Sequence, residues 1–148
     1  PGKVEVKMNE LKVADAIDEV FALLRRANKY IDETMPWALA KSEENIPRLK
    51  TVIYNLLETI RCAAVLLKPY IPETADKIFK QLGTDKTTLD TIAAFGGLEA
   101  NKPLGEASTL FARIDEKKFI EDMEAKAAAM YENEVILLED SCKYRIRL

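Results

Sequence analysis

Apolar side chains recur at alternating steps of four and three residues along two long stretches of the chain, Val13 to Ile31 and Leu49 to Leu67. Because an α-helix has 3.6 residues per turn, each set lies along one face of a helix. The pattern predicts a first helix over residues 10–33 and a second that begins near Pro47 and stops at Pro69. The second has the wider apolar face, so we expect it to be the central, most buried helix of a bundle.

Shorter patterns complete a predicted all-α fold. A third helix is expected to end at Gly83, because glycine suits the position after a helix. Thr87 and Asp90 have the spacing of a capping box, which predicts a brief helical turn after them. Asp115 is expected to begin a fourth helix, and Asn9 is a candidate N-cap for the first.

These elements divide the chain into four predicted parts. Residues 1–8 are expected to be a frayed start, residues 9–95 a helical bundle, and residues 96–130 an extended arm followed by the C-terminal helix. Within the arm, residues 109–114 are the best candidate for a strand or a packed segment. Apolar and basic residues alternate near the end of the tail, residues 131–148, which favours a hairpin or two short strands without an assigned function.

The composition excludes several kinds of active site. The chain has no histidine, so a Ser/His/Asp or Cys/His nucleophilic site is excluded and zinc binding is disfavoured. Cys62 and Cys142 lack CxxC spacing and are expected to be reduced thiols. We therefore predict no catalytic residue and no metal site.

Net charge and hydropathy limit the classes of partner that the chain can bind. A balance of 48% hydrophobic and 32% charged residues is typical of a globular domain, and no apolar run reaches the roughly 18 residues of a membrane span. We expect a cytoplasmic protein with no membrane partner. The net charge of −3 argues against a broad basic face for duplex nucleic acid, but single-stranded loops need only a local basic patch and an aromatic ring.

One such patch surrounds the predicted bend after the first helix. Proline at position 36 disfavours the α conformation for the preceding residue, so the chain should turn there and Trp37 should begin a new element. A tryptophan at a corner can be a buried wedge or an exposed platform for a base, and periodicity does not choose between them. Arg25 and Lys29 lie one helical turn apart with Arg26 beside them, so these cations can reach phosphates near the bend.

The run NKYIDETMPWALAK, Asn28 to Lys41, resembles the N-(R/K)-Y-(I/V)-D-E-x-x-P-W-x-L-A-K segment of the anticodon-binding domain of bacterial methionyl-tRNA synthetase. The likeness continues through LLKPYIP and LFARID, and it covers most of residues 10–120. It implies a helical bundle of the class I synthetase anticodon-binding type. It also implies that Trp37 stacks on an anticodon base, that Pro36 fixes its orientation, and that Asn28 belongs to the motif.

The resemblance implies two partners, the anticodon loop of tRNA(Met) and the catalytic domain of a parent enzyme. ATP and methionine would bind that catalytic domain, whose HIGH and KMSKS signatures do not occur in this sequence, so the chain alone is expected to hold no cofactor and to be inactive. The family's other anticodon readers, an Asn and an Arg four residues apart, lie on an earlier helix that has no equivalent before Glu10. Two alternatives remain at this point: the matching bundle of another class I synthetase, such as the cysteinyl or valyl enzyme, and a helical scaffold for protein partners.

Overall fold

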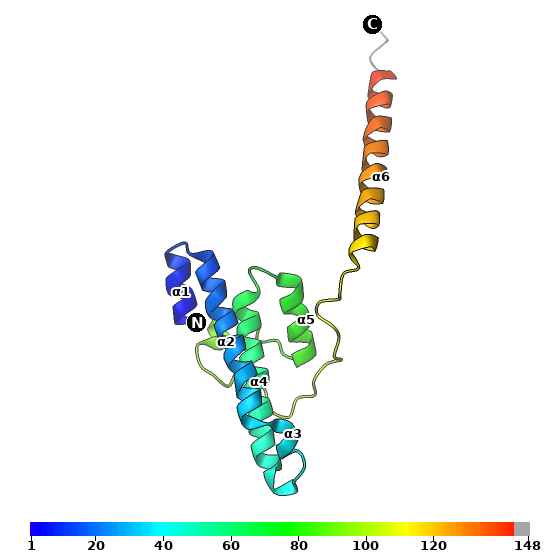
Figure 1. Ribbon diagram of the computed structural model, residues 1–148. Coiled ribbons are helices and arrows are strands. Elements are labelled where there is room, and N and C mark those ends of the chain that lie inside the picture. Colours follow the sequence, from blue (N-terminus) through cyan, green and yellow to red (C-terminus); the bar gives the residue numbers. More distant parts are fainter. Residues whose placement is uncertain (144–148) are drawn as a thin grey trace. The chain divides into compact units, whose positions relative to one another are not determined.

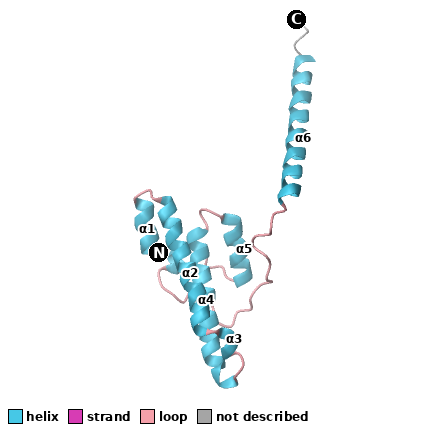
Figure 2. Cartoon of the chain, in the orientation of Figure 1, coloured by secondary structure: helices cyan, strands magenta, loops and turns pink. Residues whose placement is uncertain are grey.

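The computed structural model describes residues 1–143 of the chain, and it describes side chains up to residue 131. Figure 1 labels the helices, which are α1 (Gly2–Asn9), α2 (Val13–Thr34), α3 (Pro36–Leu39), α4 (Ile46–Leu67), α5 (Pro72–Leu82) and α6 (Glu116–Lys143). Two 3-10 turns, η1 (Glu43–Asn45) and η2 (Leu89–Ile92), lie between them. Within this part of the chain every regular element is helical (Figure 2), so the predicted all-α fold is confirmed.

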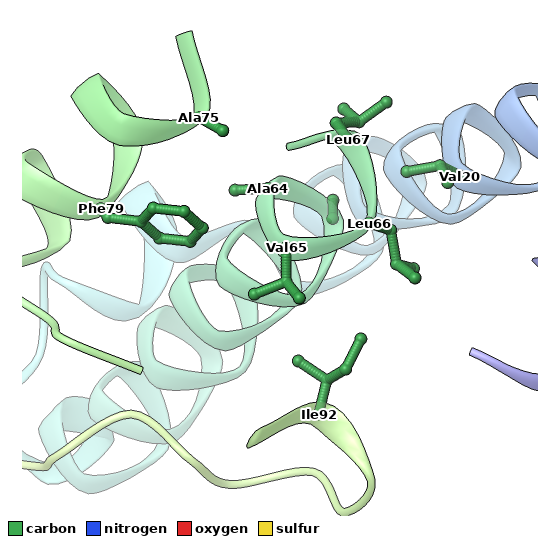
Figure 3. Close-up of a cluster of buried hydrophobic side chains, with 9 residues drawn as sticks. Val20, Ala64, Val65, Leu66, Leu67, Ala75, Phe79 and Ile92 are labelled. Atoms are coloured by element: carbon green, nitrogen blue, oxygen red, sulfur yellow. The ribbon is translucent and has the colours of Figure 1, made fainter. Parts of the chain in front are cut away.

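The chain forms two units, Pro1–Leu110 and Phe111–Leu148. In the first unit α4 is the central helix, because α2, α3, α5 and both 3-10 turns pack against it. Near its C-terminal end the buried residues run continuously from Ala63 to Leu67, so α4 is surrounded there on all sides. Figure 3 shows Val20, Phe79 and Ile92 approaching this segment from other elements. The predicted central position of the second long helix is confirmed.

The end of α5 also follows the sequence prediction. Gly83 has a left-handed backbone, with φ 62°. The N–H of Thr84 donates to the carbonyl of Phe79 over 3.2 Å, and the N–H of Gly83 donates to the carbonyl of Lys80 over 3.2 Å. These bonds satisfy carbonyls that the helix leaves free, which is the role of a glycine after a helix. The turn after Thr87 is present as η2, although no side chain caps it.

The N-terminal prediction was wrong. Residues 1–8 were expected to fray, but residues 2–8 belong to α1, and Asn9 is the last residue of that helix rather than the cap of the next. Tertiary contacts explain the difference. Val4 packs against the core, and the hydroxyl of Tyr70 donates to the sulfur of Met8 over 2.9 Å. A local pattern of apolar residues carries no information about contacts between residues as far apart as Met8 and Tyr70, and packing of this kind is what stabilises most short helices.

The arm and the tail also differ from expectation. Residues 109–114 form no strand, since the described part of the chain offers them no neighbouring strand to pair with. The predicted hairpin after residue 130 is wrong up to Lys143, because α6 continues through it; residues 144–148 lie outside the described residues. No glycine or proline occurs between Glu116 and Lys143, so nothing in the sequence stops the helix. Its predicted start is confirmed, with the N–H of Lys118 donating to Asp115 Oδ1 over 3.3 Å.

A buried ion pair on α4 holds the beginning of the arm. Glu58 and Arg61 are both 0% exposed. The guanidinium of Arg61 donates to the Glu58 carboxylate from Nε over 2.8 Å and from Nη2 over 2.7 Å. The same carboxylate accepts the backbone N–H groups of Gly96, Gly97 and Leu98 over 3.0, 2.8 and 2.9 Å. Two sequence-distant segments are therefore joined through one fully bonded carboxylate.

The far side of Arg61 holds a second loop. Its Nη1 donates to the carbonyl of Lys86 over 3.1 Å and to the hydroxyl of Thr91 over 3.0 Å, and its Nη2 donates to the carbonyl of Thr91 over 3.0 Å. No buried polar side-chain atom is left without a partner among the described residues. The sequence analysis missed both Glu58 and Arg61. The available signal was two charges three residues apart inside the otherwise apolar run from Leu56 to Leu67.

The ion pair of Glu58 and Arg61 leaves no room for a side chain at position 97, so only glycine fits there. A Cβ added at Gly97 would lie 2.5 Å from Arg61 Nη2 and 2.9 Å from Cζ. Because the guanidinium is held on both sides, it cannot move away without losing hydrogen bonds. Gly97→Ala is expected to lower the free energy of unfolding by about 1–3 kcal/mol, the usual cost of overpacking, in urea unfolding followed by circular dichroism. Gly2→Ala is the control, since nothing lies within 4 Å of that position; equal stabilities of the two variants would contradict the prediction.

Candidate nucleic-acid interface

The bend after α2 is built by two consecutive residues, Met35 and Pro36. Met35 has a left-handed backbone, with φ 43° and ψ 64°, and its N–H donates to the carbonyl of Ile31 over 2.9 Å. This closes α2 at Thr34. Pro36 then occupies the first turn of α3, where its missing N–H costs nothing. The turn predicted from the proline is confirmed, and it directs the chain from α2 into a helix of four residues.

Trp37 is exposed on this short helix. Pro36 and Leu39 are partly buried, whereas Trp37 is 56% exposed. Of the two orientations that the sequence left open, the structure therefore has the platform rather than the buried wedge. The exposed surface of the Trp37 indole is available for a flat ring, such as a nucleobase, to pack against. Stacking of an unpaired base on an aromatic side chain is a general mode of single-strand recognition.

The cations that the sequence analysis selected lie on the preceding helix, and all three are exposed. Arg26 Nη1 lies 3.1 Å from Glu33 Oε2, and Lys29 Nζ lies 3.9 Å from Glu33 Oε1. Arg25 makes no ion pair with the described residues. Exposed ion pairs contribute only about 0–1 kcal/mol, so a phosphate can replace Glu33 at little cost. The sequence analysis missed this role of Glu33, although its position four residues after Lys29 is the spacing of a helical ion pair.

Asn28 is exposed on α2, two turns before its end, and its side chain makes no hydrogen bond to the described residues. Because α2 continues to Thr34, Asn28 lies inside the helix rather than at its end. The amide is free to meet solvent or a ligand.

A groove lies beside this cluster, between α2 and α4, and we call it the α2–α4 groove. Its volume is about 330 Å³, and it is lined by Leu23, Arg26, Ala27, Tyr30, Asn55, Leu56, Thr59 and Phe95. Tyr30 is partly buried, and its hydroxyl accepts a long hydrogen bond, 3.5 Å, from Asn55 Nδ2. The groove thus adjoins the predicted cations of α2 through Arg26.

The described residues show no feature of a metal or nucleophilic site. No group of three or more His, Cys, Asp or Glu side chains among them is placed to hold a metal ion. Burial raises the pKa of the Cys62 thiol, and the neighbouring charge of Glu58 raises it further. A thiol of this kind stays protonated at neutral pH and is a poor nucleophile. No helix in this part of the chain is both long and apolar enough to cross a bilayer.

An exposed indole at a helix corner and exposed cations on the preceding helix are features found in domains that bind single-stranded nucleic acid. Comparison with known proteins defines the domain more closely. Residues 2–132 match the family model described as the anticodon binding domain of methionyl tRNA ligase. The chain belongs to this family.

Individual relatives agree. The chain is 48% identical over 121 residues to the methionine--tRNA ligase of Clostridium tetani, covering 82% of this chain and 19% of the relative. It is 42% identical over 149 residues to that of Clostridium perfringens, covering 100% of this chain and 23% of the relative. The apo methionyl-tRNA synthetase of Mycobacterium tuberculosis superposes with a TM-score of 0.71 at 28% identity, covering 77% of this chain and 23% of that one.

These matches settle one of the earlier alternatives. The resemblance stated from the Asn28 to Lys41 run is confirmed, and the family is the methionyl one rather than the cysteinyl or valyl one. The chain spans about a fifth of the length of the relatives that it matches.

Proposed function

We propose that this chain binds the anticodon loop of tRNA(Met), as the anticodon-binding part of a methionine-tRNA ligase that acts in translation. The observation that supports this most directly is the exposure of Trp37, 56%, at a bend that Met35 and Pro36 define. A tryptophan with no binding role would be expected to bury its large apolar surface. Family membership supplies the class of ligand, since the matched domain is named for the anticodon.

The proposed mechanism is binding rather than bond-making. Arg25 and Lys29, one turn apart on α2, and Arg26 beside them meet phosphates and set the position of the loop. Trp37 then stacks on one unpaired base, with Pro36 holding the backbone that carries the ring. Asn28, exposed on the same helix, is available for a hydrogen bond to RNA. Selection among tRNAs comes from the stacked base, because phosphate contacts carry no sequence information.

Two further assignments belong to the same proposal. The second partner is the remainder of the parent enzyme, including its catalytic domain. By binding the anticodon loop, this chain would hold the tRNA so that its acceptor end reaches the distant active site of that catalytic domain. ATP and methionine are assigned to that catalytic domain and not to this chain. We also propose a cytoplasmic location, where such an enzyme meets its tRNA.

Replacement of Trp37 by alanine tests the proposal. Loss of one stacking ring is worth about 1–3 kcal/mol, so the affinity for tRNA(Met) is expected to fall by roughly one to two orders of magnitude. Filter binding at constant salt measures it. Trp37→Phe, which keeps a smaller ring, should fall between the two.

The control is Phe21→Ala on α2, which removes an exposed ring, 45%, thirteen residues before the end of that helix. Its affinity should match that of the unchanged chain. If Trp37→Ala binds tRNA(Met) as tightly as the unchanged chain, or if the chain binds all tRNAs equally through charge alone, the proposal is wrong. A chain that binds no RNA but does bind peptides would support the remaining alternative, a protein-interaction scaffold.

A further inference from the structure

The α2–α4 groove has the size and lining of a binding site that the motif does not account for. Small-ligand pockets in proteins are commonly about 300–1,000 Å³, and this groove is about 330 Å³. Its lining combines apolar side chains with polar groups from Tyr30, Asn55 and Thr59. An apolar groove that also offers a few polar groups suits a flat heterocycle that has hydrogen-bonding sites around its ring.

The charge of the groove favours an anionic ligand. Among its lining residues the single charged side chain is Arg26, which is 59% exposed. Its partner Glu33 is itself 44% exposed and does not line the groove. Glu58, the acidic residue that lies deeper in α4, is neutralised by Arg61 and is 0% exposed. A phosphate at the rim would therefore meet a cation and no uncompensated carboxylate.

Phe95 forms one wall of the groove and is 62% exposed. The backbone immediately after it does not move freely, because Glu58 accepts the N–H groups of Gly96, Gly97 and Leu98. The hydroxyl of Tyr54 adds a bond to the carbonyl of Leu98 over 2.9 Å. The structure thus presents an exposed aromatic ring on a loop that a buried ion pair anchors to α4. Because the loop backbone next to the ring is already held in place, less entropy is lost when a base stacks on Phe95 than on a ring carried by a free loop.

The groove and the bend that carries Trp37 lie along the same helix, α2. Arg26 and Tyr30 line the groove, and α2 ends four residues after Tyr30. At 1.5 Å per residue, Arg26 and Thr34 are about 12 Å apart along the helix axis. One RNA loop that contacts the exposed cations of α2 can reach both ends of this distance.

We propose that the α2–α4 groove takes a second unpaired nucleobase of the RNA whose first base stacks on Trp37. Phe95 is its stacking surface, Asn55 offers an amide to the base edge, and Arg26 holds the adjoining phosphate. This inference rests on the proposed function, because it assumes that RNA is the ligand. It adds a subsite to that function, and the residues assigned to the base, Phe95 and Asn55, lie outside the Asn28 to Lys41 run.

The test uses the 148-residue chain and the anticodon stem-loop of tRNA(Met) as the probe. Trp37 is the single tryptophan of the sequence, so quenching of its fluorescence reports the first base independently of Phe95. Phe95→Ala is expected to weaken binding by roughly 5- to 150-fold, the range for loss of one stacked base. Phe95→Tyr keeps the ring and should bind within about twofold of the unchanged chain. Asn55→Asp places a negative charge in the groove and should also weaken binding.

Phe21→Ala is the matched control. Phe21 is 45% exposed. It lies on a different side of α2 from the groove, because Phe21 and the groove residue Leu23 are two positions apart and therefore point about 200° apart around the helix axis. Its affinity should be unchanged. A further variant, Arg26→Gln, should reduce the slope of log affinity against log salt by about one, as expected for the loss of one phosphate contact. Thermal unfolding of each variant verifies that the fold is retained.

The outcomes separate the two proposals. If Trp37→Ala loses affinity but Phe95→Ala and Asn55→Asp do not, the second subsite is refuted and the proposed function stands. If the unchanged chain shows neither quenching nor binding, the proposed function and the subsite fail together. If Phe95→Ala leaves RNA affinity unchanged but abolishes a concentration-dependent self-association of the chain, the groove is a protein contact and the inference is wrong.

Discussion

Replacing Arg61 by methionine is expected to lower the free energy of unfolding by about 3–5 kcal/mol, the usual cost of breaking a buried ion pair from one side. The substitution leaves the Glu58 carboxylate 0% exposed and without its two charged hydrogen bonds. It also removes the donors that hold the carbonyls of Lys86 and Thr91. Urea unfolding monitored by circular dichroism measures the loss.

Arg25→Met is the control for this effect. It removes the same charge from an exposed position on α2 that makes no ion pair with the described residues, and it should change stability by no more than about 0.5 kcal/mol. A double-mutant cycle with Glu58→Gln isolates the coupling between the two side chains. If Arg61→Met loses less than about 1 kcal/mol, the pair does not anchor the two loops as described.

Acid is expected to weaken the fold through the same carboxylate. Burial raises the pKa of Glu58, but the hydrogen bond from Arg61, the backbone N–H groups of Gly97 and Gly96, and the charge of Arg61 outweigh it and lower the pKa from 4.5 to about 2. Because the folded-state pKa is below the unfolded one, the stabilisation is fully present above about pH 4.5. It is lost as the pH falls from 4.5 toward 2. The shift corresponds to about 3 kcal/mol.

The measurement is a series of urea unfolding curves between pH 6 and pH 2. Glu58→Gln removes the titrating group, so its stability should fall less steeply below pH 4.5 than that of the unchanged chain, even though it starts lower. Glu43→Gln removes an exposed carboxylate and should keep the steep fall. Parallel curves for Glu58→Gln and the unchanged chain would show that this carboxylate does not govern acid unfolding.

Local patterns predicted the parts of the candidate site that depend on neighbouring residues. The bend follows from Pro36, which restricts Met35, and the shared face of Arg25 and Lys29 follows from their four-residue spacing on α2. The family resemblance likewise depends on a contiguous run. The exposure of Trp37 could not be predicted from the local sequence, because burial depends on which other segments cover the ring. The same local sequence is compatible with a buried wedge and with an exposed platform.

The remaining features needed contacts between distant residues. Glu58 meets Gly97 across 39 positions, and no local pattern predicts that a carboxylate in an apolar helix will accept three backbone N–H groups from a loop. The position of Phe95 in the groove depends on the same contact, because the Glu58 carboxylate holds the loop that carries this ring. The start of α1 was missed for the same reason, because Val4 and Met8 contact distant segments. The continuation of α6 was missed for a different reason: its uninterrupted run of helix formers outweighs the weak alternation of apolar and basic residues near the end of the chain.

The amino-acid order alone determined the helical class, the central position of α4, the bend at Pro36 and the family, because each depends on periodicity or on a contiguous motif. The tertiary structure alone decided that Trp37 is open, that Glu58 and Arg61 are buried together, and that Phe95 stands over a groove. These depend on the summed packing of segments that the chain brings together only when it folds, and that sum is not contained in any short stretch.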